Sequence, residues 1–228
     1  MYLAKNREPN KPVAFTGPAT YLISTQLMRL ASRRFLLFSL LLGSELLAGC
    51  GTRYADLPTF SADHQLLQLV VEMPAGSNHE LRYNPTTNEF EPRRLAGLEA
   101  VVEFLPAPGN LGFVPGTSGA AVPGGPSQPL PALLLAESQP AGTILEVLPV
   151  ALLTLDVNGQ LQPILVAVPA RPGQRILPRA TTWVSLNQYY PNVRPFLNLW
   201  FRHRAPNTRI VGWKDEQAAS QEVRRWMK

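Results

Sequence analysis

Apolar runs separated by proline and glycine recur along the chain from residue 66 onward. They are Leu66–Met73, Glu80–Tyr83, Ala100–Leu105, Ala132–Ala136, Thr143–Leu155 and Ile164–Val168. Runs bounded in this way by turn-forming residues are typical of β-strands. Because no helical period lies between them, the pattern predicts an antiparallel sheet or a small barrel.

Two helices are predicted near the C-terminus. Residues 191–204 (PNVRPFLNLWFRHR) have apolar residues at helical spacing, and Pro195 is tolerated only in a first turn. Residues 214–228 (KDEQAASQEVRRWMK) place acids early and bases late, which suits the helix dipole, and Asp215 can cap the N-terminus. Between the predicted strands, residues 109–131 are rich in glycine and proline and predict a long loop, either functional or disordered.

A different pattern occupies the N-terminal part of the chain. From Met28, basic residues precede the apolar run 35–42, and small residues precede Cys50. This order is typical of a secretory signal peptide. The apolar run is shorter than the roughly 20 residues that span a bilayer, and Glu45 interrupts it, so a transmembrane helix or a buried core helix is the weaker interpretation.

The end of this segment, Leu47-Ala48-Gly49-Cys50, resembles a bacterial lipoprotein lipobox. The resemblance implies that the Cys50 thiol receives a diacylglyceryl group and becomes the new N-terminus. Lipidation would consume the only cysteine of the chain, which could otherwise mispair in an oxidising compartment. We therefore expect a protein of the cell envelope that is lipid-anchored to a membrane and faces the periplasm or the exterior.

These features divide the chain into four parts. Residues 1–27 form an upstream extension, with Met28 as the expected start, and residues 28–49 form the signal peptide. Residues 50–64 are polar and mixed, and are expected to tether the lipid to a folded domain at 65–228.

The charge balance changes once the signal is removed. Residues 1–50 contain six of the 21 Lys/Arg residues and two of the 16 Asp/Glu residues, which leaves 15 basic and 14 acidic residues, a net charge of +1. A chain with this balance lacks the basic excess of a nucleic-acid-binding surface, so a nucleic-acid partner is not expected.

Several segments resemble family I soluble inorganic pyrophosphatases in sequence, order and approximate spacing. They are VVEMPAGSNHELRYN (70–84), RRLAG (93–97), GNLGFVPGT (109–117), PLPALLL (129–135), LPVALLTLDVNGQLQPILVAVP (148–169) and GWKDEQAASQEV (212–223). The resemblance covers nearly the whole predicted domain, and 148–169 is its most specific segment. It implies a mainly β fold, a small closed five-stranded OB-like barrel with C-terminal helices, and hydrolysis of pyrophosphate with several Mg²⁺ ions.

Part of the site implied by the resemblance is retained. Glu72 matches a glutamate of the family, Arg82 a phosphate-contacting lysine and Arg94 a phosphate-binding arginine, whereas Asn84 replaces a glutamate. Because guanidinium groups bind phosphate without a metal, the three matching residues are candidates for a residual anion site. In the alternative, the arginines pair with Glu72 and neighbouring groups and leave a neutral polar patch.

The metal ligands implied by the resemblance are missing. The D-x-D-P-x-D loop of the family is replaced here by residues 126–131 (PSQPLP), so that its aspartates fall on Pro126, Gln128 and Pro131. Residues 104–136 contain no Asp or Glu at all, and Mg²⁺ requires oxygen ligands.

A second group of family residues is also replaced. Two aspartates and a lysine fall on Val157, Gln162 and Ile164, and a tyrosine falls on Leu111. Asp156 stands one position away from the lost aspartates and is the only weak candidate for a metal ligand.

The sequence therefore predicts a pyrophosphatase-like envelope lipoprotein without an intact catalytic residue or an expected cofactor, acting as a binding or structural module. Its expected partners are membrane lipid through Cys50, a phosphate-like anion and an envelope protein. The alternative is a divergent Mg²⁺-dependent diphosphatase, whose pocket should bring together Glu72, Arg82, Arg94 and Asp156. As a third possibility, the mouth of an OB-like barrel binds an oligosaccharide or a peptide.

Overall fold

The structure is a computed structural model, and it describes residues 53–120 and 127–228. These residues belong to one compact unit, Thr52–Lys228. The predicted signal peptide, Cys50 and Pro126 lie outside the described residues. Within the described ranges, no helix is long and apolar enough to cross a membrane.

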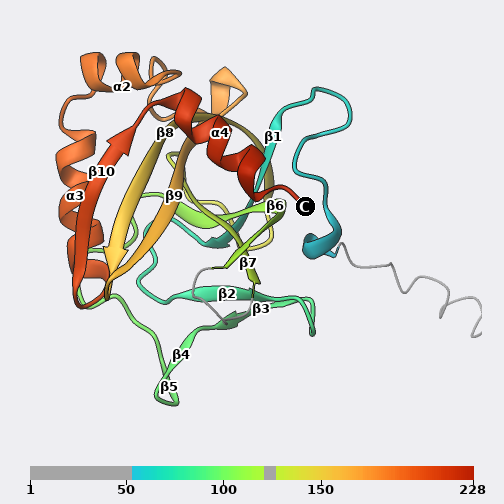
Figure 1. Ribbon diagram of the computed structural model, residues 1–228, viewed down its shortest axis with the longest axis vertical. Helices are drawn as coiled ribbons and strands as arrows, with labels where there is room; N and C mark the ends of the chain where they lie inside the picture. Colours follow the sequence, from blue (N-terminus) through green and yellow to red (C-terminus); the bar gives the residue numbers. More distant parts are fainter. Residues whose placement is uncertain (1–52, 121–126) are drawn as a thin grey trace, which may run out of the picture. The chain divides into compact units, whose positions relative to one another are not determined.

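A ring of five β-strands forms the centre of this unit (Figure 1). The six strands of the main sheet are β1 (Leu67–Met73), β6 (Asn110–Ala120), β7 (Ser127–Leu134), β8 (Ile144–Val157), β9 (Gln160–Pro169) and β10 (Thr208–Lys214). They pair in the order β1-β6-β7-β9-β8-β10, and β1 also pairs with β8, so the first five strands return to their starting point. All of these pairings are antiparallel except β7 with β9. The predicted mainly β, OB-like fold is confirmed.

Smaller elements surround the ring. The two short hairpins are β2 (Leu81–Asn84) with β3 (Glu89–Pro92), and β4 (Arg94–Leu95) with β5 (Leu98–Glu99). The helices are α2 (Trp183–Tyr189), α3 (Val193–Arg204) and α4 (Glu216–Trp226), with single 3₁₀ turns η2 (Tyr54–Asp56) and η3 (Pro172–Gln174). In Figure 1, α2 lies at the top of the molecule and the β4–β5 hairpin projects at the bottom.

Both faces of the main strands are buried, because helices cover one side of the sheet and the ring closes on the other. Alternate residues of β7 and β9 enter two separate apolar clusters. Helix α3 contributes Leu197, Trp200 and Phe201 to the first, and α4 contributes Val223 and Trp226 to the second. Burial on both faces explains why these strands read as continuous apolar runs rather than as an alternating pattern.

The C-terminal helices were predicted correctly. Helix α3 begins at Val193, which places Pro195 in its first turn. Helix α4 begins after Asp215, whose Oδ1 accepts a hydrogen bond of 3.0 Å from the backbone N–H of Ala218. Helix α2 was not predicted, because its seven residues are too few to show a helical period. Its start is marked instead by a capping box, in which the side chains of Thr182 and Ser185 accept hydrogen bonds from each other's backbone N–H groups.

The prediction of a long loop at 109–131 is wrong, because β6 and the first half of β7 lie in this stretch. Glycine serves close packing here rather than flexibility. A Cβ on Gly112 would overlap the backbone carbonyl of Val70 on the neighbouring strand β1. The pairing of β6 with β7 is interrupted between Val114 and Gly119, and this irregularity separates Pro115 from the regular ladder.

Two further differences concern β-strands. The run Ala100–Leu105 forms only an isolated bridge, between His79 and Val101, because its apolar residues are buried singly without a neighbouring strand. Strand β10 was not predicted; it pairs with β8, and none of its seven residues is fully buried.

The close approach of β1 and β6 leads to a prediction for Gly112→Ala. The added methyl group has to push the two strands apart at the Val70 carbonyl, so the free energy of unfolding should fall by about 3 kcal/mol in a denaturant titration. Gly212→Ala in β10 is the matched control, because a Cβ there meets nothing within 4 Å and should change stability by no more than about 0.5 kcal/mol. Equal losses in both variants would contradict the packing argument.

Candidate functional site

Some of the residues matched to the family site meet in a small pocket, which we call the Glu72 pocket. It is lined by Glu72, Met73, Glu80, Leu81, Arg82, Leu111, Gly112, Pro131, Ala132, Ile164 and Arg204. These residues come from β1, β2, β6, β7, β9 and the end of α3, so the pocket gathers most of the ring. Its free volume is about 30 Å³, close to the space of a single water molecule and far below that of a typical ligand pocket.

The carboxylate of Glu72 is buried near the end of β1. It accepts a hydrogen bond of 2.8 Å from the backbone N–H of Tyr83, and its Oε2 lies 3.8 Å from Nη1 of Arg82. Burial raises the pKa of Glu72 above its usual value, although Arg82 and the Tyr83 N–H oppose this shift. Two residues predicted from the sequence, Glu72 and Arg82, are therefore brought together.

A second buried carboxylate, Glu80, is held between two arginines. Its Oε2 accepts a hydrogen bond of 2.7 Å from Nη1 of Arg93, and its Oε1 accepts one of 3.0 Å from Nε of Arg204. Burial tends to raise the pKa of Glu80, but Arg204 and Arg93 outweigh that effect and hold it below its usual value. The Arg204 guanidinium also lies 5.8 Å from the ring centre of Trp200.

The remaining wall of the pocket is apolar where the resemblance implies polar groups. Leu111, Pro131 and Ile164 stand at the positions of a tyrosine, an aspartate and a lysine, and all three line the Glu72 pocket. Their convergence supports the matching of positions along the sequence. It also means that three side chains of the pocket have no group that could bind a metal or a phosphate.

These residues do not fit a Mg²⁺ ion. Magnesium requires several oxygen ligands around one point, whereas both carboxylates of the pocket already face arginines. Two carboxylates against Arg82, Arg93 and Arg204 also give the pocket a positive balance, which disfavours a cation. In the part of the chain that the structure describes, no cluster of three or more His, Cys, Asp or Glu side chains is arranged to hold a metal.

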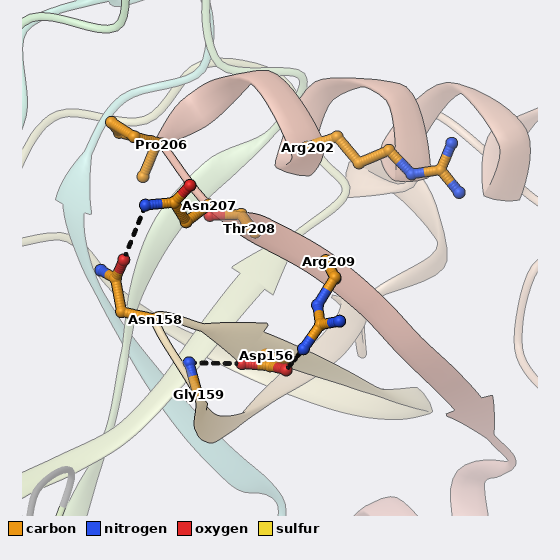
Figure 2. A pocket seen from close by; sticks show the side chains of 9 residues that line it. Asp156, Asn158, Gly159, Arg202, Pro206, Asn207, Thr208 and Arg209 are labelled. Carbon is orange, nitrogen blue, oxygen red and sulfur yellow. Dashed lines mark hydrogen bonds and ion pairs between the residues drawn. The ribbon is translucent and has the colours of Figure 1, made fainter.

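Asp156 lies in a different pocket, formed by the β8–β9 turn and the connection from α3 to β10 (Figure 2). This pocket has a volume of about 440 Å³. Asp156 accepts a hydrogen bond of 2.8 Å from the backbone N–H of Gly159 and pairs with Arg209, while the side chains of Asn158 and Asn207 bond to each other at 3.1 Å. These contacts connect β10 to the hairpin and occupy the carboxylate of Asp156.

Arg94 lines neither pocket. It lies on the exposed hairpin β4–β5, opposite Glu99. An active diphosphatase was expected to bring Glu72, Arg82, Arg94 and Asp156 together in one pocket. Only Glu72 and Arg82 meet there. Gln128 and Val157 also lie outside the Glu72 pocket, at an exposed and a partly buried position.

Sequence reasoning missed Glu80, Arg93 and Arg204. Each stands at the end of an element, where charged residues are common and carry no signal of their own. Glu80 and Arg204 are 124 positions apart, so only the fold could reveal their pairing.

Comparisons with known proteins agree with this structure. The family model of inorganic pyrophosphatase matches residues 69–228. The crystal structure of inorganic pyrophosphatase from Thermus thermophilus is similar at a TM-score of 0.65 and 22% identity, covering 77% of this chain and 97% of that one. Type I inorganic pyrophosphatase from Toxoplasma gondii is similar at a TM-score of 0.66 and 17% identity, covering 77% of this chain and 85% of that one. An inorganic pyrophosphatase from Neisseria gonorrhoeae is similar at a TM-score of 0.56 and 21% identity, covering 77% of this chain and 99% of that one. No curated protein sequence matches the chain.

The pairing of Glu80 predicts a pH-dependent loss of stability in Glu80→Gln. At pH 7 the free energy of unfolding should fall by about 2 kcal/mol, less than the full cost of breaking a buried pair because Arg93 is partly exposed. The lowered pKa of Glu80 means that its contribution is present above the ordinary value of 4.5 and is lost as pH falls through the lower folded value. Denaturant titrations from pH 7 to pH 3 should therefore show the two proteins converging.

The exposed Glu89 on strand β3 offers a matched control. Glu89→Gln removes the same charge and should change stability by no more than about 0.5 kcal/mol at any pH. Glu72 is present in every variant, and Glu80→Gln removes the least of the causes that raise its pKa, while burial, the largest cause, is unchanged. A Glu80→Gln deficit that stays constant down to pH 3 would show that the ion pairs do not stabilise the fold.

Proposed function

The chain belongs to the inorganic pyrophosphatase family, and from that premise we propose that it is a membrane-anchored, catalytically degenerate member. Its barrel then serves as a binding or structural module in the cell envelope. The observation that carries this proposal is the composition of the Glu72 pocket, in which the carboxylates face arginines and the rest of the wall is largely apolar.

The chemistry of the family explains why this composition argues against hydrolysis. Pyrophosphate and a hydroxide nucleophile are both negative, so metal ions must neutralise them and lower the pKa of the attacking water. Arginine can neutralise a phosphate but cannot supply a hydroxide. With Leu111, Pro131 and Ile164 in the wall, the pocket offers neither the ligands for a metal nor a free base for water.

A phosphate-like anion remains the best-supported ligand of small size. The side chain of Arg82 is 43% exposed, and its distance of 3.8 Å from Glu72 is longer than a hydrogen bond, so its donors are available to another partner. The free volume of about 30 Å³ is too small for pyrophosphate inside the pocket. We therefore propose that an anion binds at the rim, on Arg82, and Arg94 on the next hairpin remains a second, separate candidate.

The anchoring part of the proposal rests on the lipobox-like sequence that ends at Cys50, preceded by its basic and apolar segments. Two or more acyl chains hold a protein stably on a membrane, whereas one chain binds only marginally. An anchored barrel is confined to the envelope, where its partner is expected to be another envelope protein.

The second candidate function is a divergent Mg²⁺-dependent diphosphatase. Family membership and the retained pair of Glu72 and Arg82 favour it. It requires oxygen ligands recruited from outside the positions that the resemblance identifies.

Phosphate release from pyrophosphate separates the two candidates. The purified lipoprotein, assayed over a Mg²⁺ series beside an active family I enzyme, should show no Mg²⁺-dependent turnover, because the pocket lacks the groups that bind the metal. Circular dichroism of the same sample establishes that the domain is folded.

Two variants make this assay decisive. Turnover that rises with Mg²⁺ and drops at least tenfold in Arg82→Ala or Arg94→Ala would establish an active enzyme and overturn the degenerate assignment. Weak activity that is unchanged in both variants identifies a contaminant, which leaves the assignment standing.

Fractionation tests the anchor. The wild-type chain expressed in a bacterium should sediment with membranes and carry the added mass of a diacylglyceryl group on Cys50, whereas Cys50→Ser should lose both the lipid and the membrane association. A wild-type chain that stays soluble, with an unmodified Cys50, would rule the anchor out.

A further inference from the structure

The β4–β5 hairpin presents two leucines to solvent on a rigid support. Its strands pair Arg94 with Glu99 and Leu95 with Leu98, joined by Ala96 and Gly97. Both turn residues have positive φ, 49° and 85°, as in a type I′ turn, the connection that best matches the twist of a hairpin. Directly opposed residues of a hairpin share one face, so Leu95 and Leu98 form an apolar pair next to the turn.

The base of this hairpin is fixed to the rest of the domain. The backbone N–H of Arg93 donates to Glu80 O at 2.8 Å, that of Ala100 to Arg93 O at 2.7 Å, and that of Glu80 to Ala100 O at 3.0 Å. The buried ion pair of Arg93 with Glu80 adds a side-chain contact at the same place. A hairpin this short is not stable alone, and these contacts hold its projection in place.

Despite this fixed support, the pair is uncovered. Leu95 is 55% exposed and Leu98 is 76% exposed. A single exposed leucine needs no explanation, but two opposed leucines on a rigid projection indicate a surface that contacts an apolar partner.

The length of chain before the domain indicates which partner lies there. Tyr54 packs edge-on against the β2–β3 hairpin, with its ring centre 5.4 Å from that of Tyr83 and 5.1 Å from that of Phe90. Only three residues separate Cys50 from Tyr54. Four Cα–Cα steps span at most about 15 Å, so a lipid on Cys50 must enter its membrane within that distance of Tyr54.

The leucine pair is connected to this attachment through the β2–β3 hairpin. Strand β3, which carries Phe90, leads directly into β4, and five residue steps from Phe90 to Leu95 span at most about 18 Å. Figure 1 shows η2, the β2–β3 hairpin and the β4–β5 hairpin all away from α2. A bilayer held this close to Tyr54 is within reach of the leucines.

We propose that Leu95 and Leu98 insert into the surface of the lipid bilayer to which Cys50 is attached. The inference rests on the anchoring part of the proposed function and adds a second contact, which fixes the orientation of the domain. Because η2 and the β4–β5 hairpin both lie away from α2 in Figure 1, these two points of attachment would leave helix α2 facing away from the membrane.

The charged residues near the two attachment points have no basic excess. Arg53 and Arg94 stand against Asp56, Glu89 and Glu99, a net charge of −1, and Arg53 pairs with Asp56 at 3.5 Å. The contact is therefore apolar, and it should form equally well on neutral and on anionic lipids.

A fluorescent label at position 98 tests the insertion. Because lipidation consumes Cys50, the only cysteine of the chain, Leu98→Cys supplies a unique thiol for an environment-sensitive dye. The full lipidated protein is placed in phosphatidylcholine vesicles that contain a quencher lipid. Val184→Cys on helix α2, 69% exposed and far from the hairpin in Figure 1, is the matched control.

The label at position 98 should emit at shorter wavelength and be quenched at least threefold more than the label at position 184. Adding Leu95→Ser to the Leu98→Cys protein should reduce this quenching, because it removes half of the apolar pair. Equal quenching at the two positions, or quenching at position 98 that appears only with anionic lipid, would overturn the proposal.

Sedimentation of the vesicles before labelling tests the attachment through Cys50 independently of the insertion. A protein that sediments but whose label at position 98 remains in water contradicts only the insertion. A protein that does not sediment contradicts both the anchor and the insertion.

Discussion

The carboxylate of Glu80, buried between Arg93 and Arg204, connects three separate parts of the domain. It joins the start of β2 to the base of the β4–β5 hairpin and to the last residue of α3. Arg204 in turn lies near Trp200, whose indole N–H donates to Leu105 O at 2.8 Å. Because an unpaired buried charge is costly, each of these segments is positioned by the need to keep this group paired. The shape of the Glu72 pocket follows from it.

This arrangement differs in kind from a metal-dependent site. A metal ion is exchangeable, and its ligands must stay free to receive it. Guanidinium groups belong to the chain, so Glu80 is paired with Arg93 and Arg204 as soon as the domain folds, whereas Glu72 lies 3.8 Å from Nη1 of Arg82. An ion pair of this kind stabilises structure, whereas catalysis needs groups that are left unsatisfied until the substrate arrives. The exposed part of Arg82 is where such availability remains.

The sequence predicted those parts of the structure that depend on neighbouring residues. Runs such as Thr143–Leu155 are apolar enough to be recognised as strands, and Asp215 caps α4 through a contact three residues away. Strand β6 was missed because glycine and proline indicate turns, whereas here Gly112 allows two backbones to approach. The pairing of Glu80 with Arg204 could not be predicted, since it depends on the path of the whole chain. Glu72 and Arg82 could be matched to one pocket because the resemblance to a family implies the fold of that family, and the fold determines which distant residues meet.

The end of the chain closes the ring from outside. Met227 forms a bridge with Thr117, the backbone N–H of Lys228 donates to Gly116 O at 3.2 Å, and the ring of Trp226 occupies the space beside Gly119. Strand β6 is therefore held in place by the last residue of α4 and the two residues that follow it. The bridge between Met227 and Thr117 joins residues that lie 110 positions apart in the sequence (227 minus 117), and long-range contacts of this kind slow the folding of β-rich domains.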